Sequence, residues 1–230
     1  MPTKFSKQQI ATAIAILFHA IGLAGILIFK SEFIIRSTPV NLLLMFALLV
    51  WTQAEKNFYF FLFLLATMAV GILVEIIGVN TQMLFGNYTY GAVLGIQIKN
   101  VPLVIGINWF IIIYCCGISI HTFLRRAINK ISAETQAPPM AMKALSIIVD
   151  GATLAVFFDW LMEPVAIQLG FWKWEGGIPM YNYICWFVVS MLLLALFHFC
   201  TFSKQNKFAV HLLLIQLMFF LLLRTFLPQS

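Results

Sequence analysis

Long apolar runs recur along the chain and are separated by short polar breaks. Seven of these runs approach the roughly 20 residues that an α-helix needs to cross a bilayer. They cover residues 9–29, 38–54, 58–79, 101–121, 143–161, 181–202 and 208–227. Most breaks contain charged, glycine or proline residues, which end helices. The pattern predicts an all-α fold, a polytopic transmembrane bundle of about seven helices in which residues 1–230 form a single domain.

The composition favours the same class. The 230 residues are 62% apolar and only 10% charged, and a soluble core of this size does not need so much apolar surface. We therefore expect a multi-pass protein of the cell (inner) membrane, surrounded by membrane lipid.

Basic residues predict the orientation. Nine of the 14 lie on the side of the N-terminus: Lys4, Lys7, Lys56, Arg125, Arg126, Lys130, Lys143, Lys204 and Lys207. The other five are Lys30, Arg36, Lys99, Lys173 and Arg224. Cytoplasmic loops carry an excess of Lys and Arg, so the N-terminus is expected in the cytoplasm. The net charge of +6 then reflects topology, and no nucleic-acid partner is expected.

Four of the eight acidic residues fall in or beside apolar runs: Glu75, Asp150, Asp159 and Glu163. A carboxylate near the middle of a bilayer costs roughly 2.5–3.5 kcal/mol on insertion scales, so these acids need a reason to be there. In the predicted topology they gather with Asn80 and Asn108 towards the side opposite the N-terminus. A single site between the third, fourth and fifth runs would produce that arrangement.

The spacing of the acids leaves one conflict open. Asp159 and Glu163 are four residues apart and share a helix face. Asp150 precedes Asp159 by nine residues, which is about 180° around a straight helix and ~13 Å along it. Either Asp150 faces a different neighbour, or Gly151 and Pro164 bend the segment.

Aromatic residues crowd the loops on the side opposite the N-terminus: Tyr88, Tyr90, Trp172, Trp174, Tyr181 and Tyr183. Trp and Tyr favour the membrane interface, so a plain aromatic belt is one interpretation. The other is that these six residues line the mouth of a site for a long apolar ligand. Among them Tyr90, Trp172 and Tyr181, with the adjacent Asn182, are the expected substrate-binding residues.

Familiar cofactor motifs are absent from the sequence. The four histidines are scattered without metal-ligand spacing, and neither a GxGxxG nor a GxSxG motif occurs. No lysine lies in mid-helix to form a retinal Schiff base. We therefore expect no metal and no organic cofactor.

Acid–base chemistry by carboxyl groups remains. Burial disfavours the charged form of a carboxyl group, so a dry carboxylic acid can donate a proton to a poor base such as an alkene. Aromatic faces would stabilise the tertiary cation that results. The expected aromatic residues are Phe157, Phe158, Trp160 and Trp109.

Several long motifs resemble the membrane carotenoid biosynthesis family, which includes carotenoid 1′,2′-hydratases and bisanhydrobacterioruberin hydratases. They are EIIGVNTQMLFGNYTYG, VPLVIGINW, DGATLAVFFDWLMEPVAIQLGFWKW and IPMYNYICWF. The resemblance implies a cofactor-independent enzyme of carotenoid biosynthesis that adds water across the terminal 1,2 double bond of an acyclic end group. It also implies a lipid-soluble carotenoid substrate.

Under this interpretation Asp159 is the expected proton donor. Glu163 and Asp150 would activate water or tune the donor, and the groups that would orient water are Glu75, Asn108 and Asn80.

Three alternatives stay open. The polar groups could simply form structural bonds between helices. A carotenoid or prenyl-chain cyclase or isomerase would use the same protonation and quench the cation differently. A membrane transporter would need ionisable groups across the full depth of the membrane and an inverted repeat, and the sequence shows neither.

Overall fold

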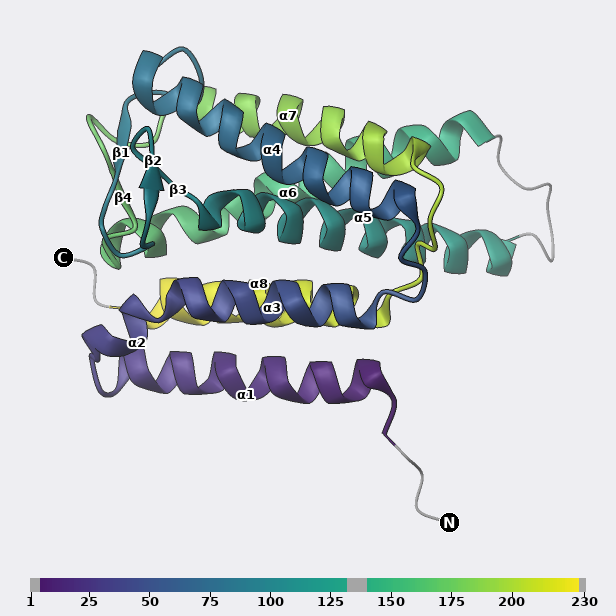
Figure 1. The fold of residues 1–230 in the computed structure, drawn as a ribbon, viewed down its shortest axis with the longest axis horizontal. Coiled ribbons are helices and arrows are strands. Elements are labelled where there is room, and N and C mark those ends of the chain that lie inside the picture. Colours follow the sequence, from purple (N-terminus) through teal and green to yellow (C-terminus); the bar gives the residue numbers. More distant parts are fainter. Residues whose placement is uncertain (1–4, 132–139, 228–230) are drawn as a thin grey trace.

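The computed structural model describes residues 5–131 and 140–227, and these ranges form a helical bundle (Figure 1). The helices are α1 (Lys7–Leu27), α2 (Glu32–Arg36), α3 (Thr38–Thr52), α4 (Phe58–Thr81), α5 (Val104–Ile131), α6 (Met140–Gln168), α7 (Met180–Phe199) and α8 (Lys207–Phe226). The short strands are β1 (Tyr88–Tyr90), β2 (Gln97–Ile98), β3 (Val101–Pro102) and β4 (Trp172–Trp174).

Each of the seven predicted runs corresponds to a helix, and the predicted all-α polytopic bundle is confirmed. Six helices in the described residues are long and apolar enough to cross a membrane: α1, α4, α5, α6, α7 and α8. The apolar helix α3 has 15 residues and spans about 22 Å, which is shorter than the ~30 Å hydrocarbon core. The five-residue helix α2 was not predicted.

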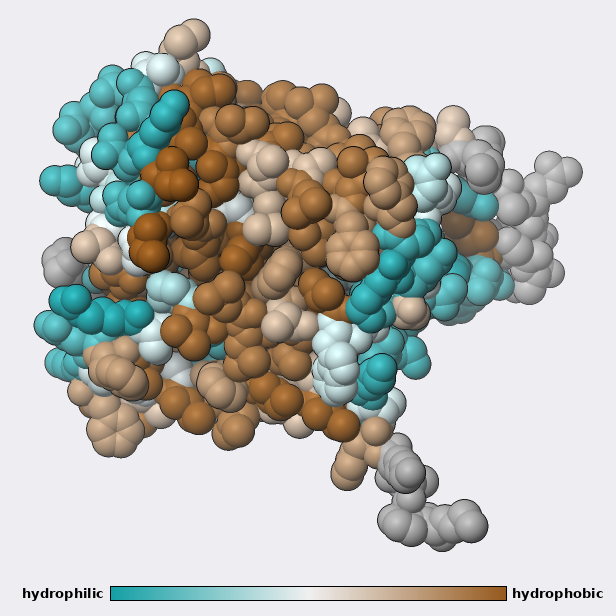
Figure 2. Space-filling model, viewed as in Figure 1, coloured by the Kyte–Doolittle hydropathy of each residue, from teal (hydrophilic) through white to brown (hydrophobic). Residues whose placement is uncertain are grey.

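The surface has the pattern of a multi-pass membrane protein. Figure 2 shows a broad apolar band with hydrophilic residues gathered at its two ends. Helix α1 begins at one end of the bundle and α8 finishes at the other, as an odd number of crossings requires (Figure 1). The four strands lie together at one end, called here the strand end.

Helix α6 is longer than the run that predicted it. It has 29 residues, about 43 Å, and continues through Pro164 to Gln168. Asp159 and Glu163 therefore lie within a helix and not at its end, which corrects the prediction. Asp150 precedes the Gln168 end of the helix by about 27 Å.

Two loops meet over the strand end by antiparallel pairing of β1 with β4. Tyr88 faces Trp174 and Tyr90 faces Trp172, while Thr89 pairs with Lys173. Side chains alternate along strands, so the four aromatic rings share one face, and Thr89 and Lys173 are exposed on the other.

Gly91 permits this close approach of the loops. A Cβ atom at Gly91 would lie 2.2 Å from the carbonyl oxygen of Gly170. The Gly91 N–H instead donates to the carbonyl of Phe171 at 2.8 Å, so the backbones of the two loops are in direct contact.

Candidate functional site

Three buried carboxyl groups line one small cavity near the strand end. Glu75 comes from α4, and Asp159 and Glu163 come from neighbouring turns of α6. Their exposed fractions are 4%, 1% and 2%. The cavity has a volume of about 20 Å³, which is enough for roughly one water molecule.

Glu75 accepts hydrogen bonds from three donors. Its Oε2 atom accepts from the Tyr88 hydroxyl and from the Tyr90 hydroxyl at 2.8 Å. Its Oε1 atom accepts from the Trp109 indole N–H at 3.0 Å. These three hydrogen bonds fix the position of the Glu75 carboxyl group at the wall of the cavity.

Glu163 is held by the other strand of the loop pair. Its Oε2 atom accepts from the indole N–H groups of Trp172 and Trp174, both at 2.9 Å. The shared face of β1 and β4 therefore supplies donors to two different carboxyl groups. Because side chains alternate along a strand, the aromatic residues of both strands point inward while the polar residues between them point outward.

Asp159 has one donor and one unpaired oxygen. Its Oδ2 atom accepts from the Asn182 side chain of α7 at 2.9 Å. Its Oδ1 atom is buried and has no hydrogen-bond partner among the described residues. A buried oxygen without a partner is costly, so this atom is suited to carry a proton or to contact a bound molecule.

The tyrosines of the cavity are suited to remain proton donors. Burial raises the pKa of Tyr90 and of Tyr88 well above the ordinary value for a phenol, and the nearby Glu75 carboxylate raises both further. Both hydroxyl groups therefore keep their protons and continue to donate to Glu75 at any ordinary pH.

Aromatic rings form the walls of the cavity. Trp109 and Trp186 stack with ring centroids 4.0 Å apart and an interplanar angle of 11°. Tyr88 and Trp174 lie 4.9 Å apart. The negative face of an aromatic ring attracts cations, so these walls suit a cationic intermediate.

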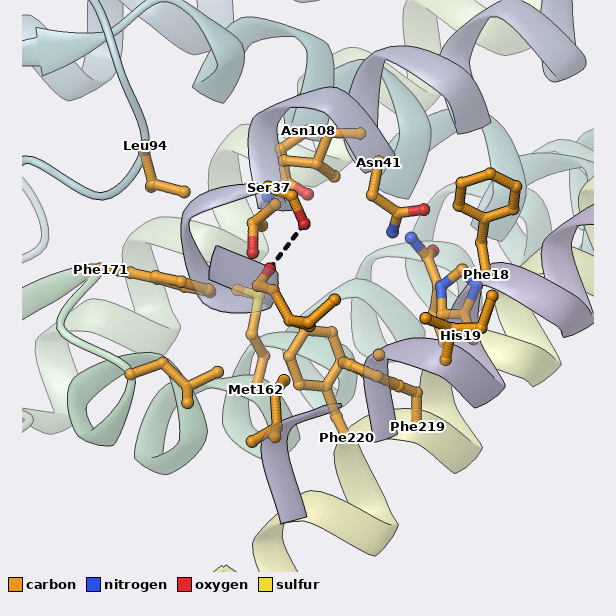
Figure 3. A pocket seen from close by; sticks show the side chains of 18 of the residues that line it. Phe18, His19, Ser37, Asn41, Leu94, Asn108, Met162, Phe171, Phe219 and Phe220 are labelled. Carbon is orange, nitrogen blue, oxygen red and sulfur yellow. Dashed lines mark hydrogen bonds between the residues drawn. The ribbon is translucent and has the colours of Figure 1, made fainter. Parts of the chain in front are cut away.

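A larger apolar pocket adjoins the carboxyl cavity. It has a volume of about 310 Å³ and lies among α1, α2, α3, α5, α6 and α8 (Figure 3). Phe158, Phe171, Phe219 and Phe220 contribute to its lining. Four residues line both spaces: Ile105, Asn108, Met162 and Trp172. An apolar molecule in the pocket would therefore lie beside the carboxyl groups.

Comparison with known proteins identifies the family. Residues 33–228, which cover all helices from α3 to α8, match the family described as carotenoid biosynthesis protein. The chain belongs to this family. The resemblance noted in the sequence is thereby confirmed, and the pocket and carboxyl cavity are those of a carotenoid biosynthesis protein.

One curated relative is a bisanhydrobacterioruberin hydratase from Haloarcula japonica. It is 25% identical over 131 residues, which cover 55% of this chain and 40% of the relative. The matched stretch is thus less than half of the relative's length. No solved structure matches the chain significantly.

Most of the predicted site residues of this carotenoid biosynthesis protein come together. Those that line the carboxyl cavity are Glu75, Tyr90, Asn108, Trp109, Asp159, Glu163, Trp172 and Asn182. Phe158 lines the apolar pocket instead. In residues 5–131 and 140–227, no three His, Cys, Asp or Glu side chains are grouped so as to hold a metal ion.

Two predicted polar residues lie elsewhere. Asp150 is exposed on α6, where it accepts a hydrogen bond from Ser146, whereas Asp159 is buried, so the two carboxyl groups do not share one pocket. Asn80 is exposed at the end of α4, and its side chain donates to the carbonyls of Ile76 at 2.8 Å and Lys99 at 3.0 Å. Asn80 therefore links the end of α4 to the loop between β2 and β3.

Three predicted aromatic residues also lie outside the cavity. Trp160 is 44% exposed and packs its ring against Arg224, while Phe157 is 47% exposed. Tyr181 is 46% exposed, and its hydroxyl donates to the carbonyl of Met83 at 2.9 Å. These residues face the surroundings of the bundle because their helix positions point away from the packed interior.

The sequence analysis missed four cavity residues as site residues: Phe85, Tyr88, Trp174 and Trp186. Tyr88 and Trp174 were considered for an aromatic belt or for the mouth of the site, but not as candidate substrate-binding residues. The alternation in Tyr88-Thr89-Tyr90 and Trp172-Lys173-Trp174 was a usable signal, since period-two alternation indicates strands with one aromatic face.

We predict that Gly71→Ala destabilises the site. A Cβ atom at Gly71 would lie 2.6 Å from Cγ of Trp109, the residue that donates to Glu75. Overpacking of this kind typically costs about 1–3 kcal/mol. Thermal unfolding of the detergent-solubilised protein measures the effect, with Ala69→Val at an exposed position of the same helix as the control. An unchanged midpoint for Gly71→Ala would contradict the packing described here.

Proposed function

We propose that the protein adds water across the terminal 1,2 double bond of an acyclic carotenoid end group. The observation that carries this proposal is the group of three buried carboxyls around a space for one water molecule, next to an apolar pocket. The name of the Haloarcula relative supports the same reaction class.

Asp159 is the proposed proton donor. A proton on its otherwise unpaired Oδ1 atom passes to the alkene carbon that leaves a tertiary cation on its neighbour. The stacked rings of Trp109 and Trp186 stabilise that cation. The donor is left as a carboxylate, which must regain a proton before the next cycle.

Glu163 is the proposed base. It takes a proton from the water molecule as the water oxygen bonds to the cation, which gives a tertiary alcohol. Glu163 lies one turn from Asp159 on the same helix face, so the proton can return to Asp159. Together these steps convert one alkene and one water molecule into one alcohol. Both carboxyl groups return to their starting states, and no cofactor is consumed.

Glu75 and Asn108 are proposed to position water and the end group. Three donors fix the position of the Glu75 carboxyl group, so it can hold water in a set orientation beside the end group. Asn108 lines both the cavity and the pocket, so its amide can contact the reacting end of the substrate.

The substrate is proposed to enter from the lipid. Three lining residues of the apolar pocket, Phe18, Ile21 and Phe33, are 43%, 48% and 78% exposed on the apolar surface of the bundle. A long polyene dissolved in the membrane can therefore insert one end group and leave the rest of its chain in lipid. Nucleic acid has no part in this proposal.

A cyclase or isomerase remains the second candidate, because it needs the same acid. The space for a water molecule beside the acid favours hydration, since water entering that space would capture the cation. A transporter is disfavoured because the buried carboxyls gather at one cavity.

Expression in a bacterium that makes lycopene or γ-carotene tests the proposal. Mass analysis of the pigments is expected to show a gain of one water molecule. An unchanged mass with a new retention time would replace hydration with isomerisation or cyclisation, and unchanged pigments in cells that hold the protein in their membranes would contradict all of these activities.

We propose that α1 begins on the cytoplasmic side of the cell membrane. Topology reporters fused after Lys130 and after Ser230 are expected to report the cytoplasm and the opposite side, respectively, because of the basic bias and the seven helices. A fusion after Lys56, a break on the same side as Lys130, is the control. Reporters at Lys130 and Ser230 on one side would contradict the odd number of crossings.

A further inference from the structure

A further pocket lies at the end of the bundle opposite the strand end, among α5, α6, α7 and the break before α8. It has a volume of about 310 Å³ and is called here the basic pocket. Three basic side chains line it: Arg125 of α5, Lys143 of α6 and Lys204 of the break. No carboxyl group of the described residues lines it, and it shares no lining residue with the apolar pocket or the carboxyl cavity.

The three positive charges are not neutralised within the part of the chain that the structure describes. No ion pair joins Arg125, Lys143 or Lys204 to an acidic side chain in residues 5–131 and 140–227. The other two ionisable residues of the lining, His121 and His198, can only add positive charge. Like charges gathered around one hollow repel one another. The basic pocket is therefore suited to an anion.

Lys204 is held in one position by its neighbours. Its ammonium group donates to the carbonyl of His198 at 2.9 Å. The same group lies 5.2 Å from the ring centroid of Phe197 and 5.6 Å from that of Phe202. Burial lowers the pKa of Lys204, because the charged form loses hydration. An anion in the pocket would offset that loss, and a side chain that is already fixed loses little entropy when it binds.

His121 offers a hydrogen-bonding atom without a partner. Its Nδ1 atom is buried and makes no hydrogen bond with the described residues. In the protonated ring both nitrogens are donors. An anionic oxygen in the pocket would stabilise that form and accept a hydrogen bond from Nδ1.

The basic pocket lies at the depth of lipid headgroups. Arg125 lies about 32 Å along α5 from Val104, and Lys143 lies about 38 Å along α6 from Gln168; both reference points are at the strand end. The hydrocarbon core of a bilayer is ~30 Å thick, so the basic side chains reach the opposite headgroup layer. Figure 1 shows that α5 and α6 extend beyond the other helices at this end.

The rest of the lining includes an aliphatic wall. Leu124 and Ile128 of α5 and Ile147 of α6 form this wall. A free inorganic anion gains nothing from an aliphatic surface, whereas a phospholipid joins a phosphate group to acyl chains. Basic pockets between transmembrane helices are known to bind the headgroups of anionic lipids. Charge and apolar surface together therefore favour a lipid.

We infer that the basic pocket binds the phosphate group of an anionic phospholipid from the surrounding leaflet. Arg125, Lys143 and Lys204 surround the phosphate, and the aliphatic wall contacts the first part of an acyl chain. The lipid joins α5, α6 and α7 at the end of the bundle that the strands do not cover. This site is separate from the carboxyl cavity, and its occupation does not depend on a carotenoid.

Native mass spectrometry of the purified full chain in detergent tests the inference, because the added mass identifies each bound lipid. The protein is mixed with equal amounts of phosphatidylglycerol and phosphatidylcholine that carry the same acyl chains. We expect it to retain roughly tenfold more phosphatidylglycerol, since the pocket repels the positive choline group.

The double variant Lys143→Gln with Lys204→Gln is expected to lose roughly tenfold or more of its affinity for phosphatidylglycerol, because each basic residue near an anionic lipid contributes about fivefold. The matched control is Lys130→Gln with Lys207→Gln, which removes the same charge at exposed positions outside the pocket. The control is expected to bind both lipids as the wild type does.

Arg125→Gln is a second test, because Arg125 is exposed and its replacement leaves the packing of the bundle unchanged. It is expected to weaken phosphatidylglycerol binding by about fivefold. Arg126→Gln, at the adjacent exposed position outside the pocket, is expected to have no effect.

Inorganic phosphate separates the two sources of a phosphate group. Millimolar phosphate is expected to leave phosphatidylglycerol bound, because it cannot use the aliphatic wall. Displacement of the lipid would show that the pocket takes free phosphate and would overturn the inference. Equal retention of the two lipids by the wild type, or equal losses in the pocket variants and their controls, would overturn it as well.

Discussion

Asp159→Asn is expected to abolish hydration while the protein still inserts into the membrane and folds. An asparagine has nearly the same shape, and its side-chain oxygen can still accept the hydrogen bond from Asn182, but it has no acidic proton to donate. A general acid typically contributes roughly 10²–10⁴-fold, and the loss of activity should be of that order. Product per amount of membrane-inserted protein, measured by mass analysis of pigments, gives the result.

Asp150→Asn is the matched control for this variant. It makes the same chemical change on the same helix, at an exposed carboxyl that does not line the cavity. It is expected to retain most activity. If Asp159→Asn stayed active while Asp150→Asn lost activity, the proton donor would have to be moved out of the cavity.

Glu163→Gln is expected to produce the second large loss, also roughly 10²-fold or more, because glutamine cannot take a proton from water. Its side-chain oxygen can still accept from Trp172 and Trp174, so the loop pairing should survive. Activity and thermal midpoint are measured together. A large loss of activity with a normal midpoint is the expected pattern.

Glu175→Gln serves as the control, since Glu175 is an exposed acid in the loop after β4. It is expected to behave as the wild type. Full activity in Glu163→Gln would show that another group, with Glu75 the nearest candidate, accepts the proton from water.

The helices could be predicted from the sequence because the length and the apolar character of each run are properties of a continuous segment. Each of the seven runs became a helix, although the end of α6 was misplaced by seven residues, from 161 to 168. Pro164 indicated a helix end, because a proline removes one backbone hydrogen bond and its ring clashes with the preceding turn. In the structure α6 nevertheless continues through Pro164 to Gln168.

The carboxyl cavity could be predicted in part. The cost of placing acids in apolar runs selected four carboxyl groups. Glu75, Asp159 and Glu163 line the cavity, whereas Asp150 does not. The pairing of Tyr88 with Trp174 could not be predicted, because it joins residues that are far apart in the sequence and depends on how the loops meet.

Orientation around a helix was the other limit. Phe158 is 2% exposed and Trp160 is 44% exposed, although they are two residues apart in a helix that is apolar on most sides. In a membrane an apolar side chain can contact either lipid or protein without a large difference in free energy. The apolar composition of a helix therefore does not distinguish its lipid-facing side from its protein-facing side. For the same reason the contribution of α1, α3 and α8 to the pocket emerged only from the packed structure.

The source of the added oxygen tests the central claim most directly. The purified protein is given an acyclic carotenoid in oxygen-18 water, without dioxygen, and the product is weighed by mass spectrometry. Hydration predicts an alcohol that carries oxygen-18, and it predicts the same yield of this alcohol with and without dioxygen. A product without the heavy oxygen, or one that forms only when dioxygen is present, would contradict the account.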